Sequence, residues 1–414
     1  MKICVVGLGY IGLPTAAMFA THGQQVVGVD KNPKVLEALS RGEIIIEEKD
    51  LDKLVKQAVT DGSLCGSEVP VEADAFIIAV PTPITAAKTA KMDYVKAATE
   101  SILPVLRKGN VVILESTSPV GTVEELMLPI LERSGLKAGV DFALGHSPER
   151  VIPGSILYEL VHNSRIAGGL TPACAEKIAA VYKCFVEGEI LLSDARTAEM
   201  AKLTENTFRD VNIAFANEMA QICENLGINA WELIRLCNMH PRVNILQPGP
   251  GVGGHCIAVD PWFIVEKQPE TAKLIHTSRL INDARPTQVA TKVLNYLEHV
   301  SDPQVTVLGV TYKPDVDDLR ESPVLEIVTL LTAAGVSVRV YDPFVSDKFG
   351  GDLMKAVTGS DLLILGVHHS QFKQLPLDEI GAVMRSKQIY DTRRFIDEEA
   401  AQAAGFTYYL LGRD

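Results

Sequence analysis

Short apolar runs recur along the first 190 residues, and stretches with helical spacing separate them. The longer runs are residues 3–6, 25–29, 75–80 and 111–114. They are rich in β-branched side chains and end in glycine or polar residues, which is typical of buried parallel strands. Two shorter segments, Ala143-Leu144 and Ser164-Arg165-Ile166, are expected to add edge strands. Strands that alternate with helices, such as the one expected over 14–21, predict a doubly wound α/β sheet.

From residue 195 onwards the apolar spacing becomes that of a helix. The recurring apolar positions are Met200, Leu203, Phe208, Val211, Ala214, Phe215, Met219, Ile222 and Leu226. The pattern predicts one long helix that ends near Gly227. A helix of about 30 residues is about 45 Å long, which is more than a small domain needs. We expect it to link two domains or to form a dimer interface; a buried core helix is the alternative.

Strand-like runs return near residue 304 and predict a second Rossmann-like domain. Residues 334–343 resemble residues 22–30, because each has a β-branched run that ends in aspartate. Gly309 stands where the first domain has Gly7. Thr311 and Pro314 replace the glycines that follow, and their side chains would obstruct a pyrophosphate on the backbone. We therefore expect a different nucleotide here, held by side chains such as those of Lys313 and Arg320.

Composition narrows the class of protein. The chain has 414 residues, of which 47% are hydrophobic and 22% are charged, as in ordinary globular proteins. Its net charge of −13 argues against a broad nucleic-acid surface. Seven scattered cysteines do not resemble a disulfide framework, so a reducing cytoplasm is expected. No apolar window is long enough for a membrane helix, and the N-terminal run is a short strand rather than a signal peptide.

The first strand leads into Gly7-Leu8-Gly9-Tyr10-Ile11-Gly12. In the dinucleotide fingerprint the first glycine makes the turn, the second admits the pyrophosphate and the third lets the helix pack closely. The helix N-terminus then faces the phosphates with its N–H groups. Asp30 ends the next strand, where a carboxylate binds ribose hydroxyls and repels a 2′-phosphate. This combination favours NAD over NADP; FAD, or a glycine turn without a ligand, is the alternative.

Two further motifs, Val80-Pro81-Thr82-Pro83 and Glu115-Ser116-Thr117, each follow a predicted strand. Ligands of open sheets lie at the carboxyl ends of strands. The hydroxyl of Thr117 is thus a candidate for contact with the cofactor or a catalytic water. A threonine that only satisfies its own turn is an equal alternative.

Cys256 lies in the glycine-rich segment 249–256, four residues before Asp260. Isolated cysteines are more often small buried hydrophobes than nucleophiles. The flanking glycines and the nearby carboxylate favour a nucleophile. A thiol beside a hydride acceptor points to oxidation of an alcohol beyond the aldehyde, through a thioester. Metal binding by His255 and Cys256 is disfavoured because no second ligand pair accompanies them.

Lys202 and Asn206 are four residues apart and share one face of the long helix. Such a lysine can stabilise an oxyanion. The alternative is a solvated lysine beside Glu199 or Glu205. Glu149, in Ser147-Pro148-Glu149-Arg150, follows a strand and is a candidate general base, although a structural role is the more common one for a single glutamate.

Taken together, these motifs resemble the NAD-dependent nucleotide-sugar 6-dehydrogenases, which include the UDP-glucose and GDP-mannose dehydrogenases. The resemblance covers essentially the whole chain and includes Tyr312-Lys313-Pro314 and Leu319-Arg320-Glu321-Ser322-Pro323. Residues 202–216 and 240–263 are most similar to the branch that acts on UDP-N-acetyl-D-mannosamine. Ala258 departs from the proline that many members have.

The resemblance implies a four-electron oxidation of the sugar C6 hydroxyl with two NAD. Cys256 would form a thiohemiacetal and then a thioester, which water hydrolyses to the uronic acid. Lys202 and Asn206 would stabilise the oxyanion, and Asp260 would assist proton transfer. Glu149 and Thr117 would position or activate water.

The same resemblance implies the remaining site residues. The cofactor contacts are Gly7, Gly9, Tyr10, Ile11, Gly12, Asp30, Pro81, Thr82 and Thr117. The substrate contacts are Glu149, Arg150, Lys202, Asn206, Arg209, Arg242, Asn244, Gly253, Lys313 and Arg320. Arg242 would come from the partner subunit of a homodimer formed through the central helix.

The predicted fold class is α/β, with two Rossmann-like doubly wound domains joined by a central helical domain. We expect the NAD-binding domain over 1–190, the central domain with the cysteine loop over 191–295, and the UDP-binding domain over 296–414. Other substrates within the family are UDP-GlcNAc, UDP-glucose and GDP-mannose. A two-electron β-hydroxyacid dehydrogenase, which needs no cysteine, and a non-catalytic NAD-binding scaffold are more distant alternatives.

Overall fold

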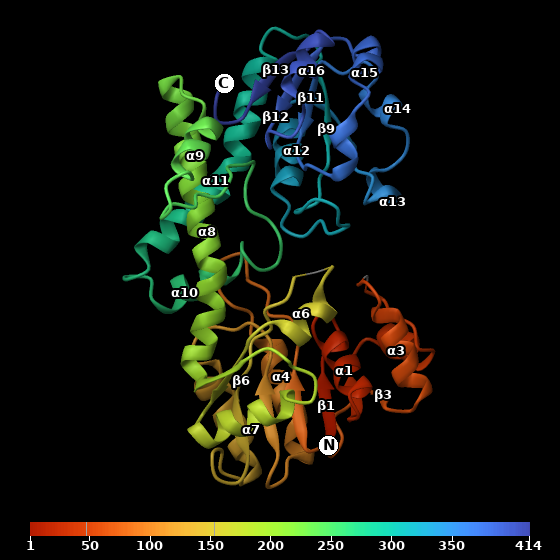
Figure 1. Ribbon diagram of the computed structural model, residues 1–414, viewed down its shortest axis with the longest axis vertical. Helices are drawn as coiled ribbons and strands as arrows, with labels where there is room; N and C mark the ends of the chain where they lie inside the picture. The colour runs from red at the N-terminus through yellow and green to blue at the C-terminus, as the bar shows by residue number, and fades with distance from the viewer. Residues whose placement is uncertain (47, 153) are drawn as a thin grey trace. The chain divides into compact units, whose positions relative to one another are not determined.

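The computed structural model describes residues 1–46, 48–152 and 154–414 (Figure 1). The chain forms two compact units. The first comprises Met1–Glu205 and Trp262–Gln268, and the second comprises Asn206–Pro261 and Pro269–Asp414. Each unit is built on its own β-sheet. The division into 1–190, 191–295 and 296–414 stays a prediction.

The described part of the first unit contains an eight-stranded sheet. In spatial order its strands are β3 (Leu64–Ser67), β2 (Gln25–Val29), β1 (Lys2–Val6), β4 (Ala75–Ile78), β5 (Val111–Leu114), β6 (Ala143–His146), β7 (Arg165–Gly169) and β8 (Ile190–Asp194). The order of the first six strands is that of a dinucleotide-binding fold. The predicted doubly wound sheet is thus confirmed.

The runs at 143–144 and 164–166 form strands, but the prediction that they lie at the sheet edge is wrong. They became β6 and β7, and β8 covers β7 as the true edge strand. β6 and β7 are antiparallel, with Gly145 opposite Gly169, whereas the other neighbouring strands of this sheet run parallel within the described residues. The start of β7 therefore lies at the same sheet edge as the end of β6.

The central strands are apolar throughout because both of their faces are covered. Ile3 and Val5 of β1 belong to a core with helices α1 (Gly12–Thr21) and α3 (Leu51–Thr60). Cys4 and Val6 face the opposite side, in a core with α4 (Asp93–Ile102). Alternate side chains of one strand thus enter different cores, as the pleat requires.

The second unit contains a five-stranded parallel sheet in its described residues. Its strands in spatial order are β10 (Ser337–Tyr341), β9 (Gln304–Leu308), β11 (Leu362–Leu365), β12 (Gln388–Asp391) and β13 (Thr407–Leu410). This is the other common doubly wound strand order, so the predicted second Rossmann-like domain is confirmed. Val305 and Val307 of β9 enter one core and Leu308 enters the other.

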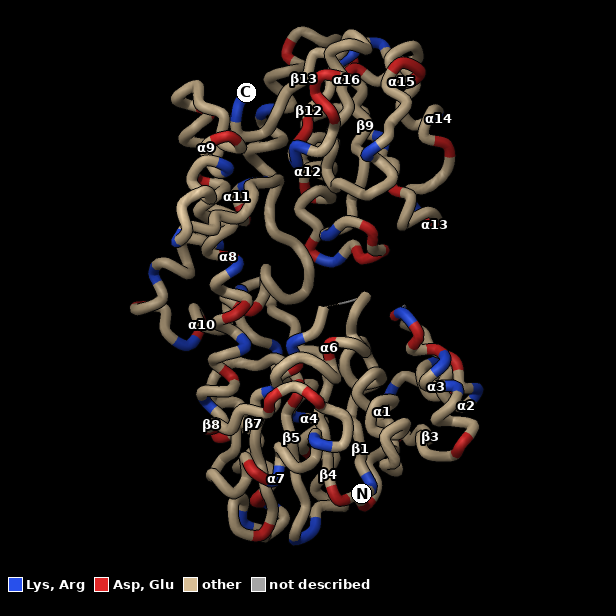
Figure 2. Tube along the Cα trace, in the orientation of Figure 1, with Lys and Arg blue, Asp and Glu red and all other residues tan. Residues whose placement is uncertain are grey.

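The remaining helices connect and cover these sheets. They are α2 (Pro33–Ser40), α5 (Leu128–Leu131), α6 (Ile156–His162), α7 (Pro172–Tyr182), α8 (Ala195–Leu226), α9 (Ala230–Cys237), α10 (Asp260–Lys267), α11 (Lys273–Tyr296), α12 (Pro323–Ala333), α13 (Ser346–Phe349), α14 (Leu353–Val357), α15 (Leu377–Val383) and α16 (Glu398–Ala403). Each helix of the described residues is too short or too polar to span a bilayer. Acidic and basic positions are interspersed along the traces of both units (Figure 2).

Helix α8 confirms the predicted long helix, with 32 residues that end at Leu226. Gly227 follows in the left-handed conformation with φ of +68°. Its N–H donates to Glu224 O, and the N–H of Ile228 donates to Cys223 O. These two bonds form the Schellman motif that ends helices at glycine.

Glu199 of α8 is a buried carboxylate that caps another segment of the first unit. It accepts hydrogen bonds from the N–H groups of Gly121 and Val123, at the start of the short π-helix η2 (Thr122–Met127). Burial raises the pKa of Glu199 to about 7, and the two backbone bonds oppose this rise. The folded protein therefore binds this proton more tightly than the unfolded chain does.

We predict that Glu199 makes the protein less stable as pH rises. A raised folded-state pKa favours folding below the unfolded value near 4.5, and this contribution is lost as pH rises through about 7. Over that window the loss is about 3 kcal/mol, at about 1.4 kcal/mol per pKa unit. Denaturant unfolding at pH 5 and pH 8 should show a smaller pH dependence for Glu199→Gln than for the wild type.

The control for this experiment is Glu176→Gln, which changes an exposed glutamate on α7. It should keep the wild-type pH dependence. An unchanged pH dependence in Glu199→Gln would exclude Glu199 as the source of the effect.

Candidate active site

The glycine fingerprint joins β1 to α1. Gly7 has φ of +96°, and a Cβ added there would lie 2.5 Å from Ala79 O. A Cβ at Gly12 would lie 1.8 Å from Gly7 O. A Cβ at Gly9 would meet no atom of the described residues within 4 Å. Gly7 and Gly12 are thus required by the protein itself, whereas Gly9 leaves open space beside the helix N-terminus, where a pyrophosphate fits.

Asp30 is held beside this turn by two backbone groups. Its Oδ2 accepts from Leu8 N at 2.9 Å, and its Oδ1 accepts from Asn32 N at 2.8 Å. The carboxylate lies at the end of β2, next to β1, and is half-buried. This is the position from which an acidic residue receives the ribose hydroxyls of NAD.

The two strand-end motifs are bonded to each other. Thr82 Oγ1 donates to Thr117 O at 2.7 Å, and Ser116 Oγ donates to Val80 O at 2.7 Å. They follow the neighbouring strands β4 and β5, and β4 pairs with β1. The structure thus brings Pro81, Thr82 and Thr117 to the same sheet edge as the glycine turn.

Glu149 and Arg150 follow β6 at this edge. One Glu149 oxygen, Oε1, accepts from Arg150 N at 2.6 Å, and Oε2 accepts from Arg165 at 3.0 Å. The guanidinium of Arg150 pairs with Glu205 at 2.7 Å and donates to Ser164 O. A direct contact of Arg150 with substrate would therefore compete with the Glu205 pair.

The acidic neighbours proposed for Lys202 have other partners. Glu199 accepts from two backbone N–H groups, and Glu205 pairs with Arg150. Lys202 is half-buried, and its positive charge interacts electrostatically with His146 at the end of β6. Burial lowers the pKa of His146 to about 3, and the charges of Lys202 and Arg165 act in the same direction.

The sequence reasoning missed a buried cluster of charged groups beside Glu149. Arg165 of β7 pairs with both Glu115 and Glu149. The signals present in the sequence were a glutamate directly after a buried strand and an arginine within the run 164–166. These two residues come together only because β7 runs antiparallel to β6, which the apolar pattern does not show.

In the second unit, three predicted residues form one chain of hydrogen bonds. Asn206 Nδ2 donates to Asp260 Oδ2, and Arg209 donates to Asn206 Oδ1. Asn206 is 1% exposed and Asp260 is 2% exposed. The amide nitrogen of Asn206 has two hydrogens, and one of them is committed to Asp260.

The cysteine loop leads directly into α10. Cys256 O accepts from Val259 N at 2.9 Å and from Asp260 N at 2.8 Å. Cys256 is half-buried and therefore partly accessible. The loop thus fixes the backbone of the thiol-bearing residue relative to Asp260.

The glycines of this loop allow it to pack closely on another segment of the second unit. A Cβ at Gly253 would lie 2.5 Å from Glu321 O, and a Cβ at Gly254 would lie 2.8 Å from the Tyr312 ring. Gly254 N also donates to Arg320 O at 3.1 Å. The loop therefore approaches the segment around Tyr312 and Arg320 of the same unit. Side chains at Gly253 and Gly254 would prevent this packing.

The other predicted substrate residues are at or near the surface of the second unit. Lys313 is half-buried, and the exposed Arg320 pairs with Asp318 at 2.6 Å. Arg242 and Asn244 are exposed on the loop after α9, where Asn244 O accepts from Asn212 at 3.1 Å.

The second Rossmann-like half repeats the hydrogen bond between a backbone N–H and the aspartate after the second strand. Here, however, the aspartate is buried. Asp342 Oδ2 accepts from Val310 N at 2.7 Å, as Asp30 does from Leu8. Asp342 is fully buried, and His369 Nε2 lies 3.1 Å from its carboxylate. A ribose cannot reach this aspartate, which supports the expectation that this half binds its nucleotide differently.

The glycine turn generates a paired prediction. Gly9→Ala should leave stability unchanged and weaken NAD binding by about tenfold or more, because the added methyl group occupies the pyrophosphate position. Gly12→Ala should instead destabilise the first unit, because its methyl group meets Gly7 O. Calorimetric titration with NAD and thermal unfolding of both variants test this pair. Full NAD affinity in Gly9→Ala would contradict the assigned role.

The chain matches known proteins over most of its length. Residues 1–186 match the NAD binding domain of the UDP-glucose/GDP-mannose dehydrogenase family, residues 196–284 match its central domain, and residues 306–398 match its UDP binding domain. A UDP-N-acetyl-D-mannosamine dehydrogenase of Escherichia coli (strain K12) is 49% identical, over 91% of this chain and 96% of the relative.

Two further relatives extend the comparison. An NDP-N-acetyl-D-galactosaminuronic acid dehydrogenase of Ralstonia nicotianae is 47% identical, over 94% of this chain and 95% of its own. The solved UDP-N-acetyl-mannosamine dehydrogenase from S. aureus is 47% identical and superposes with a TM-score of 0.92, over 100% of this chain and 99% of that one. The chain belongs to the UDP-glucose/GDP-mannose dehydrogenase family, and its dinucleotide cofactor is NAD.

Proposed function

We propose that this protein oxidises C6 of UDP-N-acetyl-D-mannosamine to the carboxylate with two NAD. The observation that carries the chemistry is the Cys256 loop, whose backbone is fixed to Asp260, which in turn is held by Asn206. The names of several relatives support the substrate. The overall reaction converts one alcohol, two NAD and one water into one carboxylate, two NADH and three protons.

The first half of the reaction forms an aldehyde and then a covalent adduct. NAD, held at the turn between Gly7 and Gly12, supplies the hydride acceptor for both oxidations. Lys202 and Asn206 would face the C6 oxygen as its negative charge develops. The Cys256 sulfur would then attack the aldehyde carbon, so that a C–S bond forms and the oxygen takes a proton.

The second half oxidises the thiohemiacetal to a thioester and hydrolyses it. Asp260 would carry protons between the oxygen and solvent, while Asn206 keeps its carboxylate in place. Water, activated by Glu149 and oriented by Thr117, would attack the thioester carbon. The C–S bond breaks, the thiolate of Cys256 leaves, and the uronate remains.

The nucleotide end of the substrate would bind the second unit. Residues 306–398 match a UDP binding domain, and Lys313 and Arg320 supply positive charge there. Arg150, Arg209, Asn244 and Gly253 would complete the sugar and phosphate contacts. All seven cysteines lie in described residues and none forms a disulfide, which supports a cytoplasmic location.

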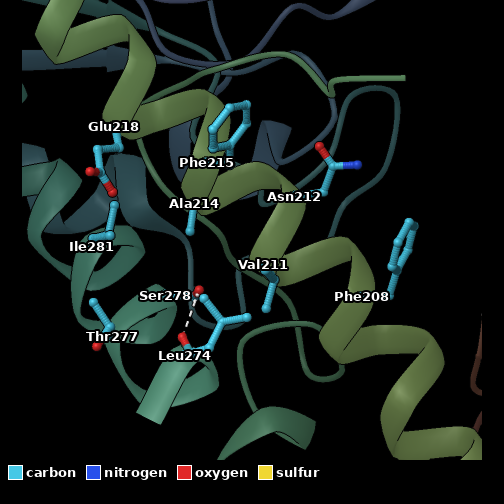
Figure 3. A pocket seen from close by; sticks show the side chains of 10 residues that line it. All are labelled: Phe208, Val211, Asn212, Ala214, Phe215, Glu218, Leu274, Thr277, Ser278 and Ile281. Carbon is cyan, nitrogen blue, oxygen red and sulfur yellow. Dashed lines mark hydrogen bonds between the residues drawn. The ribbon is translucent and has the colours of Figure 1, made fainter. Parts of the chain in front are cut away.

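We also propose a homodimer that pairs through α8. Met200, Phe208, Phe215 and Ile222 lie seven or eight residues apart on this helix, and all four are exposed. Repeats of this length place side chains on one stripe of a helix. Phe208 and Phe215 also line a groove of about 380 Å³ against Leu274 of α11 (Figure 3). An apolar groove beside an apolar stripe suits the same surface of a second copy.

The catalytic proposal predicts two NADH for each sugar oxidised. Cys256→Ser should lose uronate production by about a thousandfold or more and keep NAD affinity, because only the nucleophile is removed. NADH absorbance with limiting sugar nucleotide gives the ratio. One NADH for each sugar would contradict the thioester route.

The same assay identifies the substrate. It should be run with UDP-ManNAc, UDP-GlcNAc, UDP-glucose, GDP-mannose and UDP-N-acetylgalactosamine, the last because one relative is named for an N-acetylgalactosaminuronic acid. The highest kcat/KM is expected for UDP-ManNAc.

The control for Cys256→Ser is Cys65→Ser, which changes an exposed thiol and should behave like the wild type.

The dimer proposal predicts that Phe215→Glu gives a monomer in light scattering, because two carboxylates would be buried at the interface. Val140→Glu changes an exposed apolar residue of the first unit and should leave the dimer intact.

If Arg242 completes the site of the second copy, mixing inactive Arg242→Ala and Cys256→Ser subunits should restore about a quarter of the activity. A wild-type monomer would overturn the proposal.

A further inference from the structure

Arg165 is the centre of a buried cluster in the first unit. Its NH1 donates to Glu149 Oε2 at 3.0 Å, its Nε donates to Ser147 Oγ at 3.0 Å, and its NH2 donates to Glu115 Oε1. The guanidinium lies 3.8 Å from the centre of the Tyr182 ring. Three donors directed at three acceptors hold the planar group in one orientation.

Glu115 bonds a different terminal nitrogen of Arg165, NH2, from the one that bonds Glu149, NH1. Its Oε1 also accepts from Tyr182 Oη at 3.1 Å, and its Oε2 accepts from Thr15 Oγ1 at 3.1 Å. Thr15 belongs to α1, the helix that begins at the glycine turn. Hydrogen bonds thus connect the cofactor helix to Glu149 through Glu115 and Arg165.

Glu149 is the most exposed of the three charged residues of the cluster, although it too is buried. It is 8% exposed, whereas Arg165 is 4% exposed and Glu115 is 1% exposed. Both of its oxygens have a fixed donor, Arg165 for Oε2 and Arg150 N for Oε1. A carboxylate held in this way cannot turn, so the direction in which it accepts a proton is set by Arg165.

The charges of the cluster do not balance, since two carboxylates share one guanidinium. Burial raises the pKa of Glu115 to about 7, Arg165 opposes this rise, and the charge of Glu149 adds to it. When Glu115 holds a proton, the guanidinium remains as the counterion of Glu149. The pair of Arg165 and Glu149 is then neutral inside the protein, which a buried carboxylate needs.

We propose that Arg165 is a positioning residue for the hydrolysis of the thioester. It fixes the carboxylate of Glu149 toward the attacking water, and Glu115, with Tyr182 and Thr15, fixes Arg165. In this step the water oxygen bonds to the thioester carbon, its proton passes to Glu149, and the C–S bond breaks to release the Cys256 thiolate. The proposal rests on the proposed function, which gives Glu149 the water-activating role.

The test is rapid-mixing kinetics of Arg165→Lys, which keeps the positive charge and loses the planar set of donors. We expect a burst of two NADH for each active site at nearly the wild-type rate, followed by turnover slowed about ten- to a hundredfold. The KM should change by less than about threefold, because substrate binding is retained. Intact-mass spectra of acid-quenched samples should show the sugar nucleotide bound to Cys256.

A second variant guards against simple unfolding. The double change Arg165→Met with Glu115→Gln removes one positive and one negative charge, so the net charge of the cluster is kept. It should also give the burst and the bound sugar. Arg385→Lys, which alters an arginine paired with the buried Asp361, is the matched control and should turn over like the wild type.

The outcomes separate the two proposals. Wild-type protein that yields one NADH for each sugar overturns the proposed function, whatever Arg165 does. If the wild type yields two NADH and both Arg165 variants turn over at the wild-type rate, the positioning role is wrong. The same conclusion follows if burst and turnover fall together without an adduct on Cys256.

Discussion

The carbonyl of Gly7 lies so close to Gly12 that one added methyl group would come within 1.8 Å of it. This contact lets α1 start directly over the end of β1, and nine of the ten residues of α1 are buried as a result. The same placement brings Thr15 to Glu115 and leaves the space beside Gly9 open. The cofactor turn, the core beneath it and the charged cluster beside it therefore depend on one position without a side chain.

Strong apolar patterns predicted most of the fold, because strands buried on both faces admit few polar residues. The central strands, the 32 residues of α8 and the second Rossmann-like half all followed from spacing and composition. The antiparallel pairing of β7 with β6 did not, since the short segment 164–166, Ser-Arg-Ile, carries no signal for parallel or antiparallel pairing. Arg165 was missed for this reason, as its position at the cofactor edge depends on that pairing.

The candidate site was predicted unevenly. The glycine fingerprint and Asp30 could be placed because their spacing has a direct geometric meaning. Asn206 and Asp260 are 54 positions apart, and only the structure shows the bond between them. The glycines of the cysteine loop stand out in the sequence, but the surface on which they pack, around Tyr312, lies about sixty residues further along the chain. Long-range contacts of this kind leave no local pattern.

Arg165 and the two carboxylates that bind it are buried, and this restricts how the chain can change over evolutionary time. Loss of the arginine alone would leave the carboxylate of Glu149 buried without a counterion, and loss of Glu149 alone would remove the base. A descendant could abandon the cluster only by changing position 165 together with position 115. Among relatives, these two positions should therefore vary as a pair, although fifty residues separate them in the sequence.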